Sequence, residues 1–155
     1  MSITGPAHNV ALLDESNKII RPTLHWSDLR SQKQADTLER EYGERIFAIS
    51  GQRVNPVWTL SQLMWIRENE PHIWAGLRRI LVTKDYVRFR FTGTYLTDSF
   101  DAIGTMLYDL KRQTWSDELC GILGLLSSML PLVASSESVC GRLLPEAALD
   151  TGLSK

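Results

Sequence analysis

The chain has 155 residues, of which 43% are hydrophobic and 23% are charged, and its formal net charge is −1. This length and composition are typical of one globular domain with its own core, and a net charge near zero gives no electrostatic reason to expect nucleic acid or an anionic membrane as a partner. Two cysteines are too few for a disulfide framework or a zinc site.

Three short apolar runs near the start of the chain are predicted to be strands, over residues 2–5, 10–13 and 19–26. The polar turn at residues 14–17 separates the second run from the third. Because proline has no backbone N–H to donate, Pro22 predicts an unpaired edge within the third run. Together these runs predict a small sheet at the front of the domain.

Capping residues and helical spacing predict that helices follow this sheet. Ser27 or Asp28 is expected to start the first helix, and Gly43 is expected to end it. The later helices are expected to begin at residues with strong preferences for helix starts, namely Thr59, Pro71, Ser116 and Pro145. The chain is therefore expected to be mixed α and β.

The segment that follows Thr83 carries two conflicting signals. Apolar residues alternate with Arg88 and Arg90, which is the period of a strand. Thr83 as a capping residue, Asp85 in the first turn and Gly93 at the end are instead typical of a helix. The residue pattern alone leaves both alternatives open.

Residues 84–118 read KDYVRFRFTGTYLTDSFDAIGTMLYDLKRQTWSDE, an order of caps, glycines and acidic residues that is specific. This stretch resembles the FGGY family of carbohydrate kinases, and within it the xylulokinase branch. Residues 3–8 and 25–31 are similar to further motifs of that family, and residues 59–69 resemble its first signature. Gln62 departs from the lysine that is usual there, and Pro6 and Ala7 replace the usual glutamine and methionine.

The resemblance implies an α/β (mixed α+β) fold, as part of an N-terminal actin-like (ribonuclease H-like) ATPase domain with a small sheet and packed helices. It also implies that the segment after Thr83 is a helix. The parent activity would be ATP-dependent phosphorylation of a sugar hydroxyl by a xylulokinase-like ketose kinase of xylose metabolism. The alternative is a non-catalytic truncated domain or an interaction module on the kinase scaffold.

The resemblance places residues 1–155 in the family's N-terminal domain. The family's phosphate-binding hairpin corresponds to sequence before Met1, and its catalytic aspartate and adenosine-binding glycines correspond to sequence after Lys155. The full-length family uses ATP and Mg²⁺. We therefore expect no catalytic, cofactor-binding or metal-binding residue here, no tight ATP binding, and no kinase activity of this chain alone.

Four residues are candidates for sugar contact, and two of them, His8 and Trp26, match positions that contact the sugar in the family. His8 could exchange hydrogen bonds with a sugar hydroxyl, and Trp26 offers a flat apolar face and one N–H donor. Asp28 could accept sugar hydroxyls while Arg30 holds it by a bidentate pair. The alternatives are a structural histidine, a core tryptophan, a helix cap at Asp28 and a surface arginine.

Two other groups of charged residues invite functional interpretations that we do not favour. Asp98 and Asp101 could form a carboxylate pair for acid–base catalysis, but their turn sequence favours bonds to nearby backbone N–H groups. The arginines at 78, 79, 88 and 90 could form a nucleic-acid patch, but a solvated helix face is the preferred interpretation.

The remaining expectations concern location and partners. No basic segment precedes an apolar core at Met1, and residues 119–134 are too short and too interrupted to span a membrane, so we expect a cytoplasmic chain. The expected partner is a small ketopentose-like sugar, with no nucleic acid and no membrane. We also expect self-association or a complementing fragment, because Ile3, Val10, Leu12 and Ile20 would lack full cover.

Overall fold

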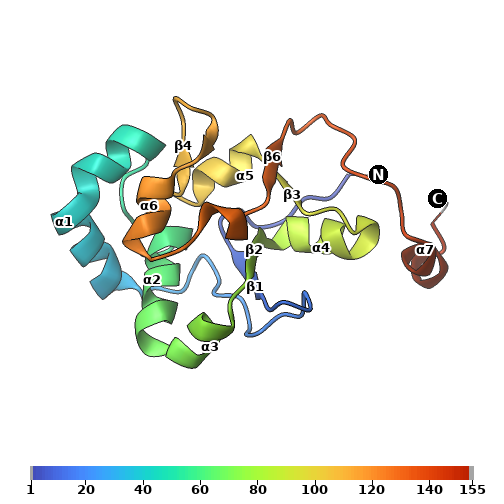
Figure 1. Cartoon of the computed structure of the whole chain (residues 1–155), viewed down its shortest axis with the longest axis horizontal. Helices are drawn as coiled ribbons and strands as arrows, with labels where there is room; N and C mark the ends of the chain where they lie inside the picture. The colour runs from blue at the N-terminus through green and yellow to red at the C-terminus, as the bar shows by residue number, and fades with distance from the viewer. Residues whose placement is uncertain (1, 154–155) are drawn as a thin grey trace.

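The computed structural model describes residues 2–153. Its strands are β1 (Val10–Leu13), β2 (Arg79–Val82), β3 (Leu96–Asp98), β4 (Tyr108–Asp109), β5 (Thr114–Trp115) and β6 (Leu132–Ala134). Its helices are α1 (Gln32–Ser50), α2 (Thr59–Asn69), α3 (Pro71–Gly76), α4 (Thr83–Thr92), α5 (Ser99–Gly104), α6 (Asp117–Ile122), α7 (Pro145–Thr151) and the 3₁₀ turn η1 (Ser127–Met129). Figure 1 shows short strands at the centre, with α1, α2 and α3 on one side and α4 and α7 on the other. The mixed α/β class predicted from the sequence is confirmed.

The strands form three separate pairs within residues 2–153. β1 and β2 pair antiparallel, with Val10 opposite Val82. β3 and β6 pair parallel, with Leu96 opposite Leu132, and β4 and β5 form an antiparallel hairpin. A parallel pair needs a long connection, and here α5, the hairpin and α6 lie between β3 and β6.

Strand β1 is buried on both faces, because its side chains point alternately to opposite sides. Val10 and Leu12 pack into the main core, whereas Ala11 and Leu13 pack into a smaller cluster beneath α4. The expected lack of cover at Val10 and Leu12 is therefore wrong, since they are only 5% and 1% exposed. Strand β2, which no sequence pattern predicts, pairs with β1, and residues of α2 complete the cover.

Two other predicted strands are absent from the described residues. Residues 2–5 have no regular structure, and the run over 19–26 contributes only one isolated bridge, between Ile19 and Leu13. Within the described residues, the rest of these two runs has no neighbouring strand to pair with, so its backbone groups form no continuous ladder of strand-to-strand hydrogen bonds. The sheet at the front of the domain is smaller than expected.

The first helix also differs from the prediction at both ends. It begins at Gln32, beyond Ser27 and Asp28, and it continues through Gly43, which is buried inside it. The helix ends at Gly51, which adopts the left-handed conformation at φ 69° and donates its N–H to the Phe47 carbonyl. Gly51 is the glycine that ends this helix because it occupies the left-handed cap.

The other helix signals are confirmed to within one residue. Segment α4 is a helix that ends at Gly93 with φ 69°, and the Ser116 hydroxyl accepts the Leu119 N–H at the start of α6. Thr59 and Thr83 are the first helical residues of α2 and α4 rather than their caps. Helices α3 and α7 begin at their prolines as predicted.

The core lies between β1, β2 and the helices α1, α2 and α6. Its fully buried large side chains are Leu12, Leu13, Leu38, Ile46, Leu60, Leu63, Ile66, Ile80, Leu81, Met106, Leu107 and Leu119. Cys120 is also buried within it, and burial raises the pKa of this thiol to about 12. Among residues 2–153, no helix combines the length and apolar character that a membrane crossing requires.

Candidate functional site

The ring of His8 lies in a narrow slot just before β1. On one side it packs against Trp58, with ring centroids 4.5 Å apart at an angle of 34°. It also lies close to Gly104, the last residue of α5, where a Cβ atom would lie only 2.8 Å from His8 Nδ1. The backbone is also held, because the Thr59 hydroxyl donates to the His8 carbonyl at 2.7 Å.

The slot controls the charge of His8. Burial lowers the pKa of its imidazole, and the nearby Asp101 carboxylate only partly opposes this effect. Nδ1 is buried and has no hydrogen-bond partner within the described residues. At neutral pH the ring is therefore uncharged, and it can act as a donor or an acceptor toward a neutral hydroxyl.

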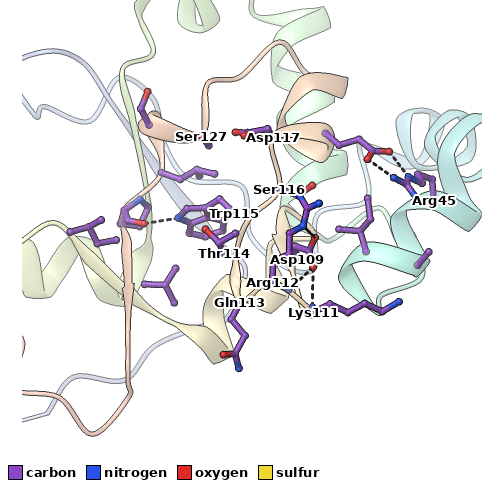
Figure 2. A pocket seen from close by; sticks show the side chains of 18 of the residues that line it. Arg45, Asp109, Lys111, Arg112, Gln113, Thr114, Trp115, Ser116, Asp117 and Ser127 are labelled. Carbon is purple, nitrogen blue, oxygen red and sulfur yellow. Dashed lines mark hydrogen bonds and ion pairs between the residues drawn. The ribbon is translucent and has the colours of Figure 1, made fainter.

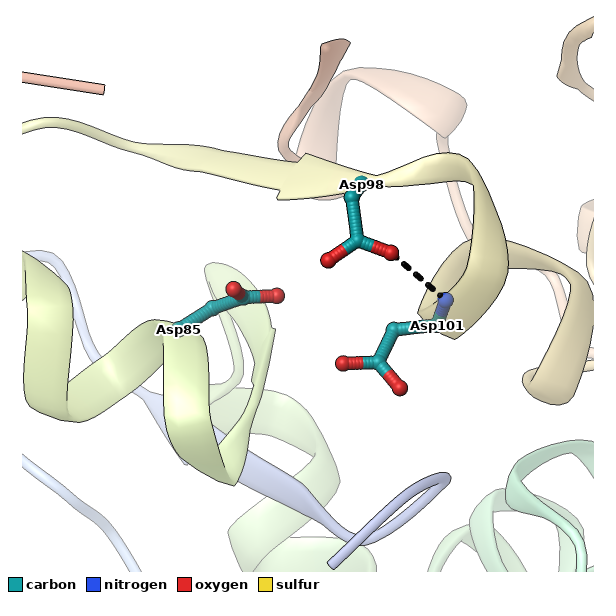
Figure 3. A group of neighbouring side chains, drawn as sticks. All are labelled: Asp85, Asp98 and Asp101. Atoms are coloured by element: carbon teal, nitrogen blue, oxygen red, sulfur yellow. Dashed lines mark hydrogen bonds between the residues drawn. The ribbon is translucent and has the colours of Figure 1, made fainter. Parts of the chain in front are cut away.

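Next to His8 lies a cluster of charged side chains centred on Lys84. Figure 3 shows the carboxylates of Asp85, Asp98 and Asp101 converging from α4, the end of β3 and α5. The Lys84 ammonium contacts all three, at 2.7 Å from Asp85 and 2.8 Å from each of the other two. Asp98 also accepts the Asp101 N–H at 3.0 Å, the local backbone bond that the sequence predicted for this turn.

The three carboxylates offer oxygen atoms within 4.8 Å of one another, a spacing that could hold a cation. In this structure the Lys84 ammonium contacts each of the three. Mg²⁺ requires a near-octahedral shell of oxygen atoms at about 2.1 Å, and a lysine placed among the ligands is incompatible with it. The cluster therefore fits an ion-pair network that joins three elements, and we assign no metal to it.

Burial and ion pairing act in opposite directions on these groups. For Asp98, burial opposes ionisation, but hydrogen bonds from Lys84 and the Asp101 amide bring its pKa below the ordinary value. For Asp101, burial dominates over Lys84, and its pKa is raised. Burial also disfavours the Lys84 ammonium, but its bonds to Asp101, Asp85 and Asp98 outweigh this and raise its pKa. Lys84 therefore stays charged.

Arg88 is part of the same network, so the solvated face predicted for it is wrong. Its side chain is 16% exposed, and Nη1 lies 2.9 Å from Asp85, which is fully buried. Arg88 also donates to the Leu96 carbonyl. A buried Asp85 one turn earlier in the helix attracts this arginine inward. Arg90 is exposed, as predicted.

Trp26 lies in a turn rather than at the end of a strand, and it is 54% exposed. Its ring centroid is 5.1 Å from that of His25. The alternative of a core tryptophan is therefore excluded by its exposure. An indole face in this position is accessible to a ligand.

Asp28 and Arg30 form the bidentate pair predicted from the sequence. Arg30 Nε lies 2.9 Å from both oxygens of Asp28, and this hydrogen bonding lowers the pKa of the carboxyl. The Arg30 guanidinium also lies 4.9 Å from the ring centroid of Trp65. Asp28 does not cap α1, which begins four residues later.

Two amide side chains hold the segment of Trp26, one from Asn9 next to His8 and one from Gln62 in α2. Asn9 donates to the Leu24 carbonyl at 2.9 Å, and Gln62 donates to the His25 carbonyl at 3.2 Å. Both amides are buried, and their carbonyl oxygens have no partner within residues 2–153. The structure thus fastens the two predicted segments to each other, although the two rings pack against different neighbours.

The structure also contains two cavities that lie away from the predicted sugar residues. One, of about 970 Å³, lies between α1, the β4–β5 hairpin and β6, and Figure 2 shows Arg45, Asp109 and Trp115 around it. The other, of about 760 Å³, lies beside Lys84 and the segment 135–143. None of the four predicted sugar residues lines either cavity. The Arg45–Glu118 ion pair, at the rim of the first, is exposed.

Comparison with known proteins agrees with this fold. The model of the FGGY family of carbohydrate kinases, N-terminal domain, matches residues 1–155. The chain belongs to the FGGY family of carbohydrate kinases. It is 34% identical over 153 residues to a xylulose kinase of Bacillus subtilis and 32% identical over 153 residues to one of Escherichia coli, covering 99% of this chain in each case.

Solved structures of FGGY relatives have the same arrangement. A protein described as a xyloylose kinase from Brucella ovis matches 90% of this chain with a TM-score of 0.86 at 34% identity. A xylulose kinase from Rhodospirillum rubrum matches 95% with a TM-score of 0.90 at 27% identity. The fold is thus that of sugar kinases with an actin-like ATPase fold, as predicted.

The chain spans about a third of the length of the curated relatives it matches. It covers 31% of the Bacillus subtilis protein and 31% of the Escherichia coli protein. Similar shares, 29% and 30%, hold for the two solved structures.

Two residues of the His8 slot, Trp58 and Gly104, were not identified as candidates from the sequence. Trp58 directly precedes the signature that begins at Thr59, and Gly104 lies within the specific stretch of residues 84–118. Its place in that stretch is the sequence signal for Gly104, whereas its burial at a helix end without a left-handed φ, which indicates a close neighbour, is visible only in the structure. Nothing in the local sequence indicates that the neighbour is His8.

Proposed function

We propose that this chain supplies the sugar-contacting face of an FGGY kinase that transfers the γ-phosphoryl group of ATP to a hydroxyl of a ketopentose such as D-xylulose. The observation that carries the proposal is the uncharged ring of His8, held in a slot beside β1. The kinship with xylulose kinases supports the class of substrate.

Each predicted residue has a role that fits its surroundings. His8 would exchange a hydrogen bond with a sugar hydroxyl, and the half-exposed Trp26 would cover the apolar face of the sugar. Asp28, held ionised and oriented by Arg30, would accept hydroxyl hydrogen bonds. These contacts position the sugar, which is most of what phosphoryl transfer requires from its acceptor side.

ATP and Mg²⁺ would supply the phosphoryl group and offset its charge. We assign neither of them to residues of this chain. The ion pairs of Asp85, Asp98 and Asp101 with Lys84 support a structural role for these carboxylates.

The test is an exchange of this chain for the matching third of the Bacillus subtilis xylulose kinase. We expect the chimera to release ADP in a D-xylulose-dependent manner. His8→Ala and Trp26→Ala should each raise KM about 5- to 100-fold, as expected for a lost hydrogen bond or stacked face. His72→Ala and Phe100→Ala, which remove exposed side chains of similar type, are the matched controls.

The second candidate function is a non-catalytic module on the same scaffold, which the absence of a glycine-rich phosphate loop of the Walker type from these 155 residues favours. A folded chimera without any sugar-dependent turnover would support that candidate. Equal KM values for all four variants would instead remove His8 and Trp26 from the sugar site. Circular dichroism of the chimera separates both outcomes from a failure to fold.

A further inference from the structure

Gly104 has no local reason to be a glycine. Its φ lies outside the left-handed region, so a residue with a side chain could adopt the same backbone. It is the last residue of α5, and glycine is a poorer helix former than alanine. Gly76, the last residue of α3, occupies the equivalent place in its own helix, and a Cβ there would meet nothing within 4 Å. The requirement at Gly104 therefore comes from a neighbour.

That neighbour is the ring of His8. A Cβ on Gly104 would lie 2.8 Å from Nδ1, 3.7 Å from Cγ and 3.8 Å from Cβ of His8. Real Cβ atoms do not approach a ring nitrogen this closely, so the ring or α5 would have to move. Gly104 is buried, and the Asp98 cap and the Lys84 ion pairs hold α5 from the other end.

Other contacts also restrain His8. Its ring packs against Trp58, with ring centroids 4.5 Å apart, and its backbone is already in the left-handed region at φ 52°. Its carbonyl accepts from Thr59, and the next side chain, Asn9, is fixed to the Leu24 carbonyl. A strained φ held by several contacts is typical of a residue whose position matters for function.

We infer that Gly104 is a positioning residue, whose missing side chain lets the His8 ring enter the slot against Trp58 with Nδ1 toward α5. Nε2 is then the nitrogen left for a ligand. This assignment rests on the proposed function only where it says that the ligand is the sugar. The slot itself stands on the geometry of His8, Trp58 and Gly104.

The test compares Gly104→Ala, His8→Ala and the double variant in the 155-residue chain, with Gly76→Ala as the matched control. Gly104→Ala should lower Tm by about 3–10 °C, as overpacking does, and should shift the His8 ring resonances in NMR spectra. In the His8→Ala background the same substitution should leave Tm unchanged or raise it. Gly76→Ala should leave the His8 resonances unshifted and should keep Tm within about 2 °C of its starting value.

A third readout separates the slot from the proposed function. Titration with D-xylulose, followed by NMR, should show that Gly104→Ala weakens sugar binding about tenfold, close to the effect of His8→Ala. Unchanged His8 resonances in Gly104→Ala, or the same Tm loss in both backgrounds, would overturn the inference. If the Tm effects of Gly104→Ala and His8→Ala are coupled but His8→Ala does not change D-xylulose binding, the slot is upheld and the sugar site is overturned.

Discussion

Lys84 Nζ lies 2.8 Å from Asp101 Oδ2, and this ion pair fastens α4 to α5. The same ammonium reaches Asp85 and Asp98, so one lysine balances three carboxylates near the His8 slot. Because α5 carries Gly104, the position of the slot depends on this network. Replacing Lys84 by a neutral residue would leave the carboxylates of Asp85, Asp98 and Asp101 facing one another.

We predict that Lys84→Met destabilises the chain by about 2–4 kcal/mol. Breaking a fully buried pair costs about 3–5 kcal/mol, and the expected loss is smaller here because 15% of the Lys84 side chain remains exposed. Urea denaturation measures the change. Lys33→Met, an exposed helical position, is the control and should stay within about 0.5 kcal/mol. Equal stability of the two variants would contradict a structural role for the network.

A second prediction concerns the two arginines of α4. Arg88→Ala should cost about 2 kcal/mol, because it removes one partner of the buried Asp85 while Lys84 remains as the other. Arg90→Ala should stay within about 0.5 kcal/mol, since Arg90 is exposed. The sequence pattern places both arginines on one solvated face and predicts equal denaturation midpoints for the two variants. A lower midpoint for Arg88→Ala alone would support the structure, and equal midpoints would contradict it.

The third prediction is a pH dependence caused by His8. Its pKa in the folded chain lies below the ordinary value of 6.5, so below that value the unfolded chain binds a proton that the folded chain resists. Stability therefore falls as the pH is lowered through this window, by at most about 1.4 kcal/mol per pH unit. His8→Asn, which tolerates the left-handed φ and does not titrate there, should lose less stability between about pH 7.5 and pH 5.5. Parallel curves for the two proteins would show that His8 is not desolvated.

The elements predicted correctly are those whose signals are local. A serine cap at Ser116, a proline at Pro145 and a glycine at Gly93 act within one turn, and all three are confirmed. The prediction that Gly43 ends the first helix is wrong because a glycine inside a helix and a left-handed glycine cap look alike in sequence, and of the two only Gly51 has a positive φ.

The features that were missed depend on contacts between distant segments. Strand β2 is stabilised by pairing with β1, about 70 residues earlier in the chain, and its own four residues carry little pattern. The slot of His8 is closed by Gly104, on a helix far along the chain. Of the candidate site, the Asp28–Arg30 pair was predictable because the two residues are neighbours.

The fourth prediction is that the 155-residue chain alone does not phosphorylate sugars. Phosphoryl transfer depends on groups that hold the phosphates and Mg²⁺, and the sequence contains no glycine-rich phosphate loop of the Walker type. The assay is ADP release in the presence of ATP, Mg²⁺ and D-xylulose, L-ribulose, glycerol or gluconate. Sustained turnover that requires both ATP and sugar would refute the prediction, and the chimera described above is its positive control.

The last prediction is that the chain self-associates through the edge of β6. The expected apolar edge at Val10 and Leu12 is buried, but Leu132 on β6 is 74% exposed, and within the described residues β6 pairs only with β3. An exposed strand edge with an apolar side chain recruits other chains.

Leu132→Lys should therefore shift the chain toward monomer, because a charge at the edge of a strand opposes pairing with a second copy. Leu29→Lys, the same change at a residue that is 61% exposed before α1, is the control and should not alter association. Size exclusion with light scattering over a range of concentrations measures both. A wild-type chain that stays monomeric at the highest concentration would show that the β6 edge does not pair, and association reduced equally by both substitutions would point to a general effect of charge.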